Sequence, residues 1–147
     1  MIRLAFLLAV ALLVTGCLQE PDLDLNIQNR PGLTFVFDGR SYASQFEVLQ
    51  LPKPNPPNKV NPFAFSGETI WKISTATPIK GSDWPRIAYG EAPQQFAQTV
   101  PENGTPPKLT EDKLYVGRVT GGKDAQTTVF FEIRNGKAVN VSDKLMH

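Results

Sequence analysis

The chain has 147 residues, of which 41% are hydrophobic and 20% charged, a composition that suits one domain with a hydrophobic core. Its 15 basic and 14 acidic side chains nearly cancel, and the sequence contains neither a basic run nor an aromatic-basic stripe. Nucleic-acid binding requires a concentrated positive surface, so we expect no nucleic-acid partner. The single cysteine excludes a disulfide within the chain.

The first segment of the chain has the layout of a secretory signal. Arg3 supplies a positive charge, residues 4–14 are eleven apolar residues in a row, and Thr15-Gly16 are the small residues that precede a cleavage site. The apolar run is too short for a transmembrane helix, which needs about 20 residues. We expect residues 1–16 to be a signal peptide that is removed.

Cys17, the only cysteine, directly follows Val14-Thr15-Gly16. This tetrapeptide resembles the lipobox of bacterial lipoproteins, in which a diacylglyceryl group is attached to the thiol and the preceding peptide is then cleaved off. The resemblance implies a palmitate-type lipid on Cys17 that anchors the protein to a membrane of the cell envelope, with no other cofactor. The alternative, an ordinary signal peptide with a chance cysteine, would leave an odd thiol in an oxidising compartment.

The residue after the cysteine bears on location. In lipoproteins an aspartate at this position favours retention at the inner membrane, and this chain has Leu18 there. The resemblance therefore implies the outer membrane, with the protein facing either the periplasm or the cell surface.

We interpret residues 17–31, which are polar and rich in turn-forming residues, as a tether, and residues 32–147 as a single domain. The tether contains a stretch that begins like a calcium loop, D-x-D-x-N from Asp22. However, Ile27 and Leu33 stand where such a loop requires a glycine and a bidentate glutamate. The sequence therefore predicts no metal site here.

Short segments rich in β-branched and aromatic residues recur along the domain, separated by Pro, Gly, Asn and Asp. We predict strands at residues 33–37, 46–51, 69–74, 86–90, 94–100, 114–120, 127–134 and 137–141. The proline-rich residues 52–62 cannot lie within a sheet, because proline lacks the donor that a ladder needs. We interpret them as a stiff loop, the alternative being a polyproline ligand for a partner's aromatic groove. Asn135-Gly136 predicts a type I′ hairpin turn between the last two strands.

This pattern of short strands without a long helical period indicates an all-β fold, a small antiparallel β-sandwich. Leu109, six residues before Tyr115, together with Trp71 in an earlier strand, resembles the fibronectin type III pattern and its tyrosine corner. The resemblance implies an immunoglobulin-like sandwich in which Leu109 caps the core and the Tyr115 hydroxyl bonds the backbone near the corner. It also implies that the Tyr115 ring packs against Trp71 from the opposite sheet. Gly117 departs from the pattern, because a branched residue is expected at that inward position.

No catalytic set can be assembled from these residues. His147, the only histidine, is the last residue, and acylation consumes the only thiol, so Ser-His-Asp triads, cysteine nucleophiles and His-based metal sites each lack a member. Residues 117–124 read G-x-x-x-x-G-K like a phosphate-binding loop, but Asp124 replaces the required Ser or Thr and a strand follows instead of a helix. We therefore interpret the segment as a hairpin turn and expect no nucleotide. Adjacent Glu111 and Asp112 point apart and do not form a shared acid-base site.

Three aromatic residues form a possible binding patch. Trp84 lies in a turn-rich segment, and Tyr89 and Phe96 follow closely in sequence. Exposed aromatic clusters often mark binding surfaces, and the alternative interpretation is that all three pack in the core.

These observations lead us to expect a non-enzymatic envelope lipoprotein that binds another envelope protein or supports an envelope assembly. One variant of this interpretation is an inhibitor or immunity lipoprotein that acts against a toxin or hydrolase. A different class, an envelope glycan or lipid hydrolase that uses carboxylates, also stays open.

Replacement of the lipidated residue tests the lipobox interpretation. Cys17→Ala should abolish incorporation of a labelled fatty acid and move the protein out of the membrane fraction, because the acyl attachment site is lost. Both are measured by labelling and fractionation of cells. Retention of label and location together would refute the interpretation.

Overall fold

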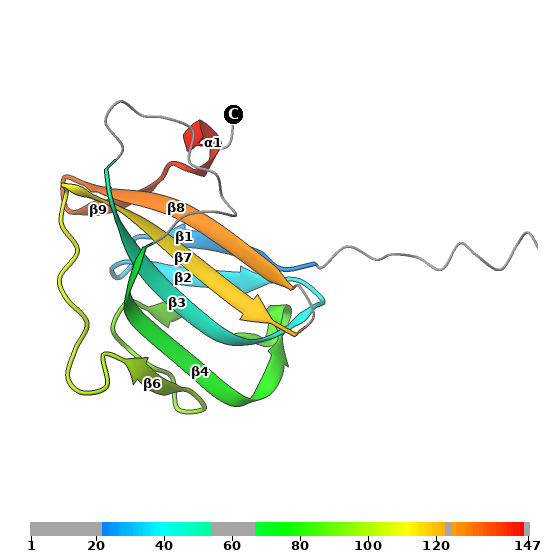
Figure 1. The fold of residues 1–147 in the computed structure, drawn as a ribbon. Helices are drawn as coiled ribbons and strands as arrows, with labels where there is room; N and C mark the ends of the chain where they lie inside the picture. The colour runs from blue at the N-terminus through cyan, green and yellow to red at the C-terminus, as the bar shows by residue number, and fades with distance from the viewer. Residues whose placement is uncertain (1–21, 54–66, 123–124, 146–147) are drawn as a thin grey trace, which may run out of the picture.

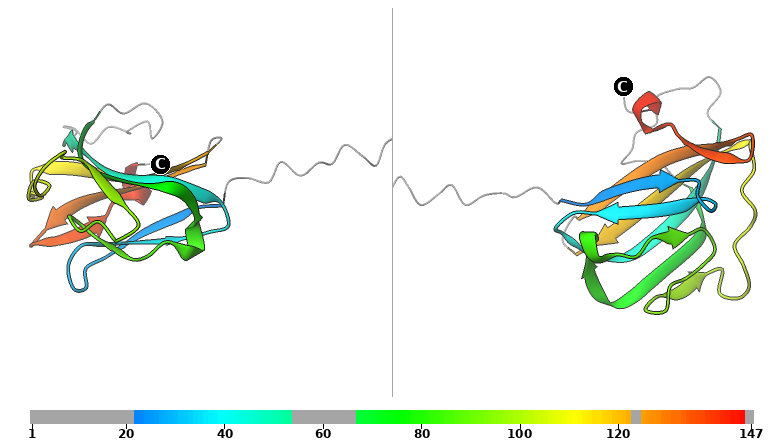
Figure 2. Two further views of the ribbon diagram at one scale, coloured as in Figure 1. Left: turned by 90° about the horizontal axis from the view of Figure 1, so that it is seen from below. Right: turned by 180° about the vertical axis from the view of Figure 1, so that it is seen from behind.

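The computed structural model describes residues 22–53, 67–122 and 125–145, so Cys17, His147 and most of the proline-rich segment lie outside the described residues. The described chain forms two antiparallel β-sheets that pack face to face (Figure 1). The left view of Figure 2 shows β1 and β2 as a layer below β3 and β4. The predicted all-β sandwich is confirmed.

One sheet has three strands in the order β1-β2-β5, and the other has six in the order β6-β4-β3-β7-β8-β9. The strands are β1 (Asp24–Gln28), β2 (Thr34–Asp38), β3 (Tyr42–Pro52), β4 (Glu68–Lys80), β5 (Ile87–Ala88), β6 (Ala97–Val100), β7 (Lys113–Gly121), β8 (Gln126–Arg134) and β9 (Lys137–Asn140). Immunoglobulin-type sandwiches set strands A, B and E against C, F and G. The order β1-β2-β5 against β3-β7-β8 follows that arrangement, with β4 beside β3 and with β6 and β9 added at the edges.

Short helical turns complete the described chain. A 3-10 turn, η1 (Gly81–Asp83), follows β4, and the one-turn helix α1 (Ser142–Leu145) follows β9. Within the described residues no helix is long and apolar enough to span a membrane. Leu145 belongs to a second apolar cluster on the outer face of the six-stranded sheet, with Leu49, Leu51, Leu114, Val116, Phe130 and Val141.

The predicted tether over residues 17–31 is wrong in its second half, because residues 24–28 form strand β1. Leu25 lies opposite Phe37, and Ile27 lies opposite Phe35, in the register of β1 with β2. Leu25 is 6% exposed. The alternation of apolar Leu25 and Ile27 with polar neighbours gives β1 one inward face, so the domain begins well before residue 32.

Aromatic rings connect the two sheets at the centre of the core. Phe35 of β2 is fully buried, and its ring centroid lies 4.6 Å from that of Phe46 in β3 and 5.9 Å from that of Phe131 in β8. A Cβ atom on Gly117 of β7 would lie 3.2 Å from the Phe35 ring and 3.1 Å from Val129. Glycine therefore replaces the expected branched residue because the Phe35 ring occupies the space of a side chain.

The predicted tyrosine corner is present. Tyr115 is fully buried, its hydroxyl accepts a 2.8 Å hydrogen bond from the Thr110 backbone N–H, and Leu109 packs half-buried against the core. The predicted contact with Trp71 from the opposite sheet is wrong, because β4 and β7 belong to the same sheet with β3 between them. The Tyr115 ring instead stacks on Phe131 at 5.5 Å.

Two substitutions at Tyr115 separate its hydrogen bond from its packing. Tyr115→Phe should cost about 1 kcal/mol of unfolding free energy, because the Thr110 N–H loses its acceptor. Tyr115→Ala should cost roughly 3–5 kcal/mol, because a large buried ring is removed. Chemical denaturation measures both, and small, equal losses would contradict the burial of this ring.

The predicted type I′ hairpin between β8 and β9 is confirmed, since Asn135 has φ +51° and Gly136 φ +72° while Arg134 pairs with Lys137.

Gly136→Val should destabilise the fold by about 1–3 kcal/mol, because it forces a β-branched residue into positive φ. Gly32→Val is the matched control, since no atom lies within 4 Å of a Cβ at that turn position. Equal melting temperatures for the two variants would contradict the assigned turn.

Candidate functional site

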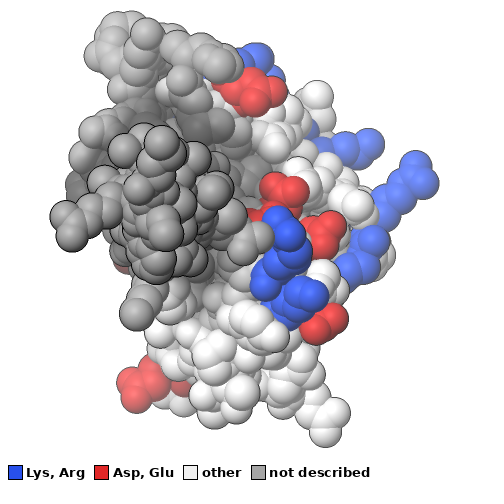
Figure 3. All heavy atoms as spheres, turned by 90° about the vertical axis from the view of Figure 1, so that its right-hand side faces the viewer, with Lys and Arg blue, Asp and Glu red and all other residues white. Residues whose placement is uncertain are grey.

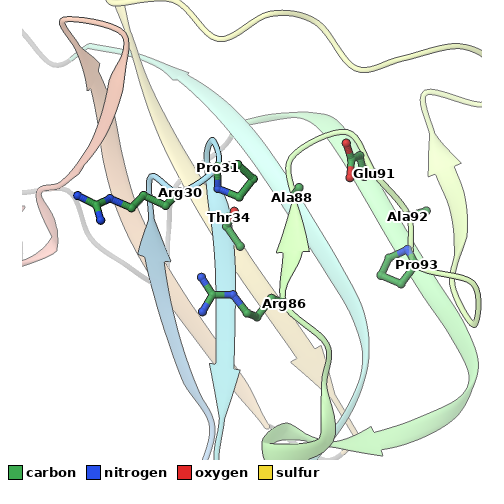
Figure 4. Close-up of a pocket in the computed structure, with 8 residues that line it drawn as sticks. All are labelled: Arg30, Pro31, Thr34, Arg86, Ala88, Glu91, Ala92 and Pro93. Atoms are coloured by element: carbon green, nitrogen blue, oxygen red, sulfur yellow. The ribbon is translucent and has the colours of Figure 1, made fainter.

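The outer face of the three-stranded sheet carries a hollow of about 400 Å³ at the end where β1 turns into β2 (Figure 4). It is lined by residues 30–31 of that turn, by Thr34 and by residues of the segment 86–93 around β5. We call it the Arg30–Arg86 hollow. Its lining includes charges of both signs, from Arg30, Arg86 and Glu91.

The floor of the hollow is formed by two paired strands. Phe35 faces the core, so its neighbour Thr34 faces the opposite side of the sheet. Thr34 lies opposite Ala88 in the register of β2 with β5, and its hydroxyl donates a 3.1 Å hydrogen bond to the Gly32 carbonyl. The side chain is only 4% exposed. The floor is therefore small, mostly apolar and held by sheet pairing.

Charged side chains flank this floor on two sides. The Arg86 guanidinium donates a hydrogen bond to the side-chain oxygen of Gln28, which lies on the far side of Thr34 in β1. In Figure 4 the Arg86 side chain reaches from the β5 side over β2, the Arg30 side chain extends away from Thr34 past β1, and Glu91 lies on the opposite side beyond Ala88. The hollow thus has a basic flank and an acidic flank.

The loop after β5 positions the acidic flank. The Glu91 backbone N–H donates a 3.0 Å hydrogen bond to the Ala88 carbonyl, which closes a tight turn. Gly90 in this turn has φ +85°, a conformation that glycine adopts without strain. Ala92 and Pro93 continue from this turn as the apolar wall of the hollow.

The hollow suits recognition of charged groups. A guanidinium presents planar donors that match carboxylate or phosphate oxygens, and a carboxylate such as Glu91 accepts from a basic group. All three charged side chains are exposed, so each ion pair they form contributes little affinity and mainly selects between ligands. The described lining contains no nucleophile with an adjacent base.

The structure places the predicted aromatic patch in and beside the core. Trp84 is 6% and Phe96 7% exposed, their ring centroids lie 4.9 Å apart, and the Trp84 indole N–H donates to the Ile79 carbonyl. Tyr89 is half-buried and its hydroxyl donates a 2.8 Å hydrogen bond to the Pro107 carbonyl. Burial raises the pKa of the Tyr89 hydroxyl above its usual value. The three residues follow the core-packing alternative and form no exposed patch.

The other charged residues of interest lie elsewhere. Glu111 and Asp112 are exposed in the turn before β7, where the hydroxyl of Thr110 donates to Asp112 and lowers the pKa of its carboxyl group. On the outer face of the six-stranded sheet, the Arg118 Nε donates a 2.7 Å hydrogen bond to Glu47 and joins β7 to β3. Glu47 also accepts from the Thr69 hydroxyl at 3.1 Å, so this pair fastens three strands together.

No pattern in the sequence indicates the Arg30–Arg86 hollow. Arg30 falls in the segment interpreted as tether, and Arg86 stands 56 positions later in the chain. Only the pairing of β2 with both β1 and β5 brings the two arginines to one face. No local motif could have joined them.

Within residues 22–53, 67–122 and 125–145, no group of three or more His, Cys, Asp or Glu side chains is placed to hold a metal ion. No family model matches the sequence, and neither the curated proteins nor the solved structures contain a match to this chain.

Proposed function

We propose that the protein is a lipid-anchored, non-enzymatic binding module of the bacterial cell envelope. In this proposal acyl chains on Cys17 hold it at the outer membrane, and the Arg30–Arg86 hollow recognises an envelope protein. The partner segment carries an acidic group that meets the arginines and a basic group that meets Glu91. The module acts as an accessory of an envelope assembly.

The observation that carries this proposal is the position of the hollow relative to the start of the domain. Asp24 pairs with Asp38 at one end of the β1–β2 ribbon, and Gln28 pairs with Thr34 at the other. The described chain begins at the first end (right view of Figure 2), and the residues that line the hollow lie at the second. A lipid on Cys17 therefore leaves the hollow turned away from the bilayer and accessible to a partner.

The energetics favour a local partner. An exposed ion pair contributes about 0.2–1 kcal/mol to binding. Two or three such pairs are therefore too weak to keep a freely diffusing partner bound to the hollow when that partner is at low concentration. Anchoring in the same membrane raises the effective concentration of a partner and makes weak, selective contacts sufficient. A membrane-bound or membrane-associated protein segment fits this requirement.

Photocrosslinking from the hollow tests the proposal. Ala92 is exposed and lines the hollow, so a benzophenone amino acid at this position should give a discrete crosslinked protein in intact cells. Ala76 in β4 is also exposed and lies outside the hollow, and the same probe there should not give that product. The double charge reversal Arg30→Glu and Arg86→Glu should remove the product because it inverts the basic flank.

A surface reversal elsewhere provides the control for charge. Lys144→Glu lies on α1 outside the hollow and should leave the crosslink intact. The proposal fails if Ala92 and Ala76 give the same products, or if the product survives the double reversal. All variants should retain the wild-type melting temperature, because the replaced side chains are exposed.

A further inference from the structure

The chain enters the domain at a point that is fixed to the turn between β2 and β3. The Asp22 backbone N–H donates a 2.9 Å hydrogen bond to the Ser41 hydroxyl, and the Ser41 backbone N–H donates a 3.0 Å bond to the Asp22 carbonyl. Arg40 Nε lies 2.8 Å from the Asp22 carboxylate. These contacts hold Asp22 as part of the folded domain.

The length of chain before Asp22 limits how far the domain can stand from a bilayer. Five residue steps separate Cys17 from Asp22, so their Cα atoms lie at most about 18 Å apart. A lipid-bearing residue sits near the hydrocarbon boundary, and the headgroup zone of one leaflet is roughly 5–8 Å thick. With a lipid on Cys17, Asp22 would therefore lie at most about 10–13 Å beyond the headgroup surface.

An exposed aromatic side chain stands at this same end. Tyr42, the first residue of β3, directly follows Ser41 and is 59% exposed, and it is the only large hydrophobic side chain of the described residues that is exposed. Arg40 precedes it, and Lys80 of β4 lies opposite it in the strand register. A tyrosine flanked by long basic side chains is typical of groups that lie at a membrane interface, with the ring among headgroups and the cations at phosphate level.

We propose that the domain rests on the membrane by this end and that the Tyr42 ring lies in the lipid headgroup region. We call residues 38–42 and 80–83 the membrane-facing end. The inference rests on the proposed acylation of Cys17, because the anchor supplies the proximity. The short tether brings this end to the bilayer, and Tyr42, which as a single tyrosine does not bind a protein to a membrane, adds to a contact that the tether sets.

The charges of this end indicate which lipids the contact needs. Exposed Asp38 and Asp83 lie at the same end as Arg40 and Lys80. Figure 3, which looks onto this side of the molecule, shows acidic and basic side chains interspersed instead of one basic patch. The contact is therefore expected in purely zwitterionic vesicles and should change little when anionic lipid is added.

Spin labelling at Tyr42 tests the inference in the acylated full-length protein. The sequence has no cysteine besides Cys17, whose thiol the lipid blocks, so Tyr42→Cys gives one reactive site. Lys137→Cys, exposed on β9 at the opposite end, is the matched control. In phosphatidylcholine vesicles we expect the label at 42 to collide with a water-soluble nickel chelate several-fold less often than the label at 137, and more often with oxygen.

Each outcome has a distinct meaning. Equal nickel collision rates at the two positions, in protein that carries the acyl label, would overturn the membrane-facing end and leave the proposed anchor intact. Reaction of the spin label with Cys17 itself would show a free thiol, which overturns the anchor and with it this inference. A melting temperature equal to that of the unlabelled protein confirms that the substitution at the exposed position 42 preserves the fold.

Discussion

The spacing of the two sheets depends on the ring of Phe35, which projects from the three-stranded sheet and fills the volume left free by Gly117 in the other. The ring lies 4.6 Å from Phe46 and 5.9 Å from Phe131, so one side chain contacts three strands of the opposite layer. Through Phe131 it reaches the stacked ring of Tyr115. Protein interiors are packed too tightly to tolerate a second side chain in that volume, so Phe35 and Gly117 require each other.

Both proposed surfaces depend on this interlock, because they lie at opposite ends of the sandwich that it holds together. At the hollow end the Asn29 side chain donates to the Ala138 carbonyl at 2.8 Å and accepts from the Ala138 N–H at 2.9 Å. The amide thus takes the place of a neighbouring strand on the edge of β9, which ties the β1–β2 turn to the last strand. The Asn29 amide also occupies the Ala138 N–H and carbonyl, which could otherwise form hydrogen bonds with a strand of another chain.

Local chemistry explains which features could be predicted from the sequence. The hairpin at Asn135-Gly136 and the corner at Tyr115 were predictable because a turn dipeptide and a six-residue spacing encode them directly. Strand β1 was missed because the acidic residues around Leu25 suggested a solvated tether, although alternation was present. The Arg30–Arg86 hollow could not be predicted, since pairing between distant strands creates it, and the burial of Trp84 follows from contacts with Phe37 at 4.7 Å and with Phe96.

In the proposed arrangement the short tether orients the domain on the membrane, so lengthening that tether is the most direct test. A flexible Gly-Ser insertion of about 20 residues after Leu18 adds a mean reach of roughly 25 Å and should leave acylation and thermal stability unchanged. We predict that nickel collision of a spin label at position 42 then rises to the value found at position 137. Protection at position 42 that persists with the long tether would contradict the claim that tether length orients the domain on the membrane.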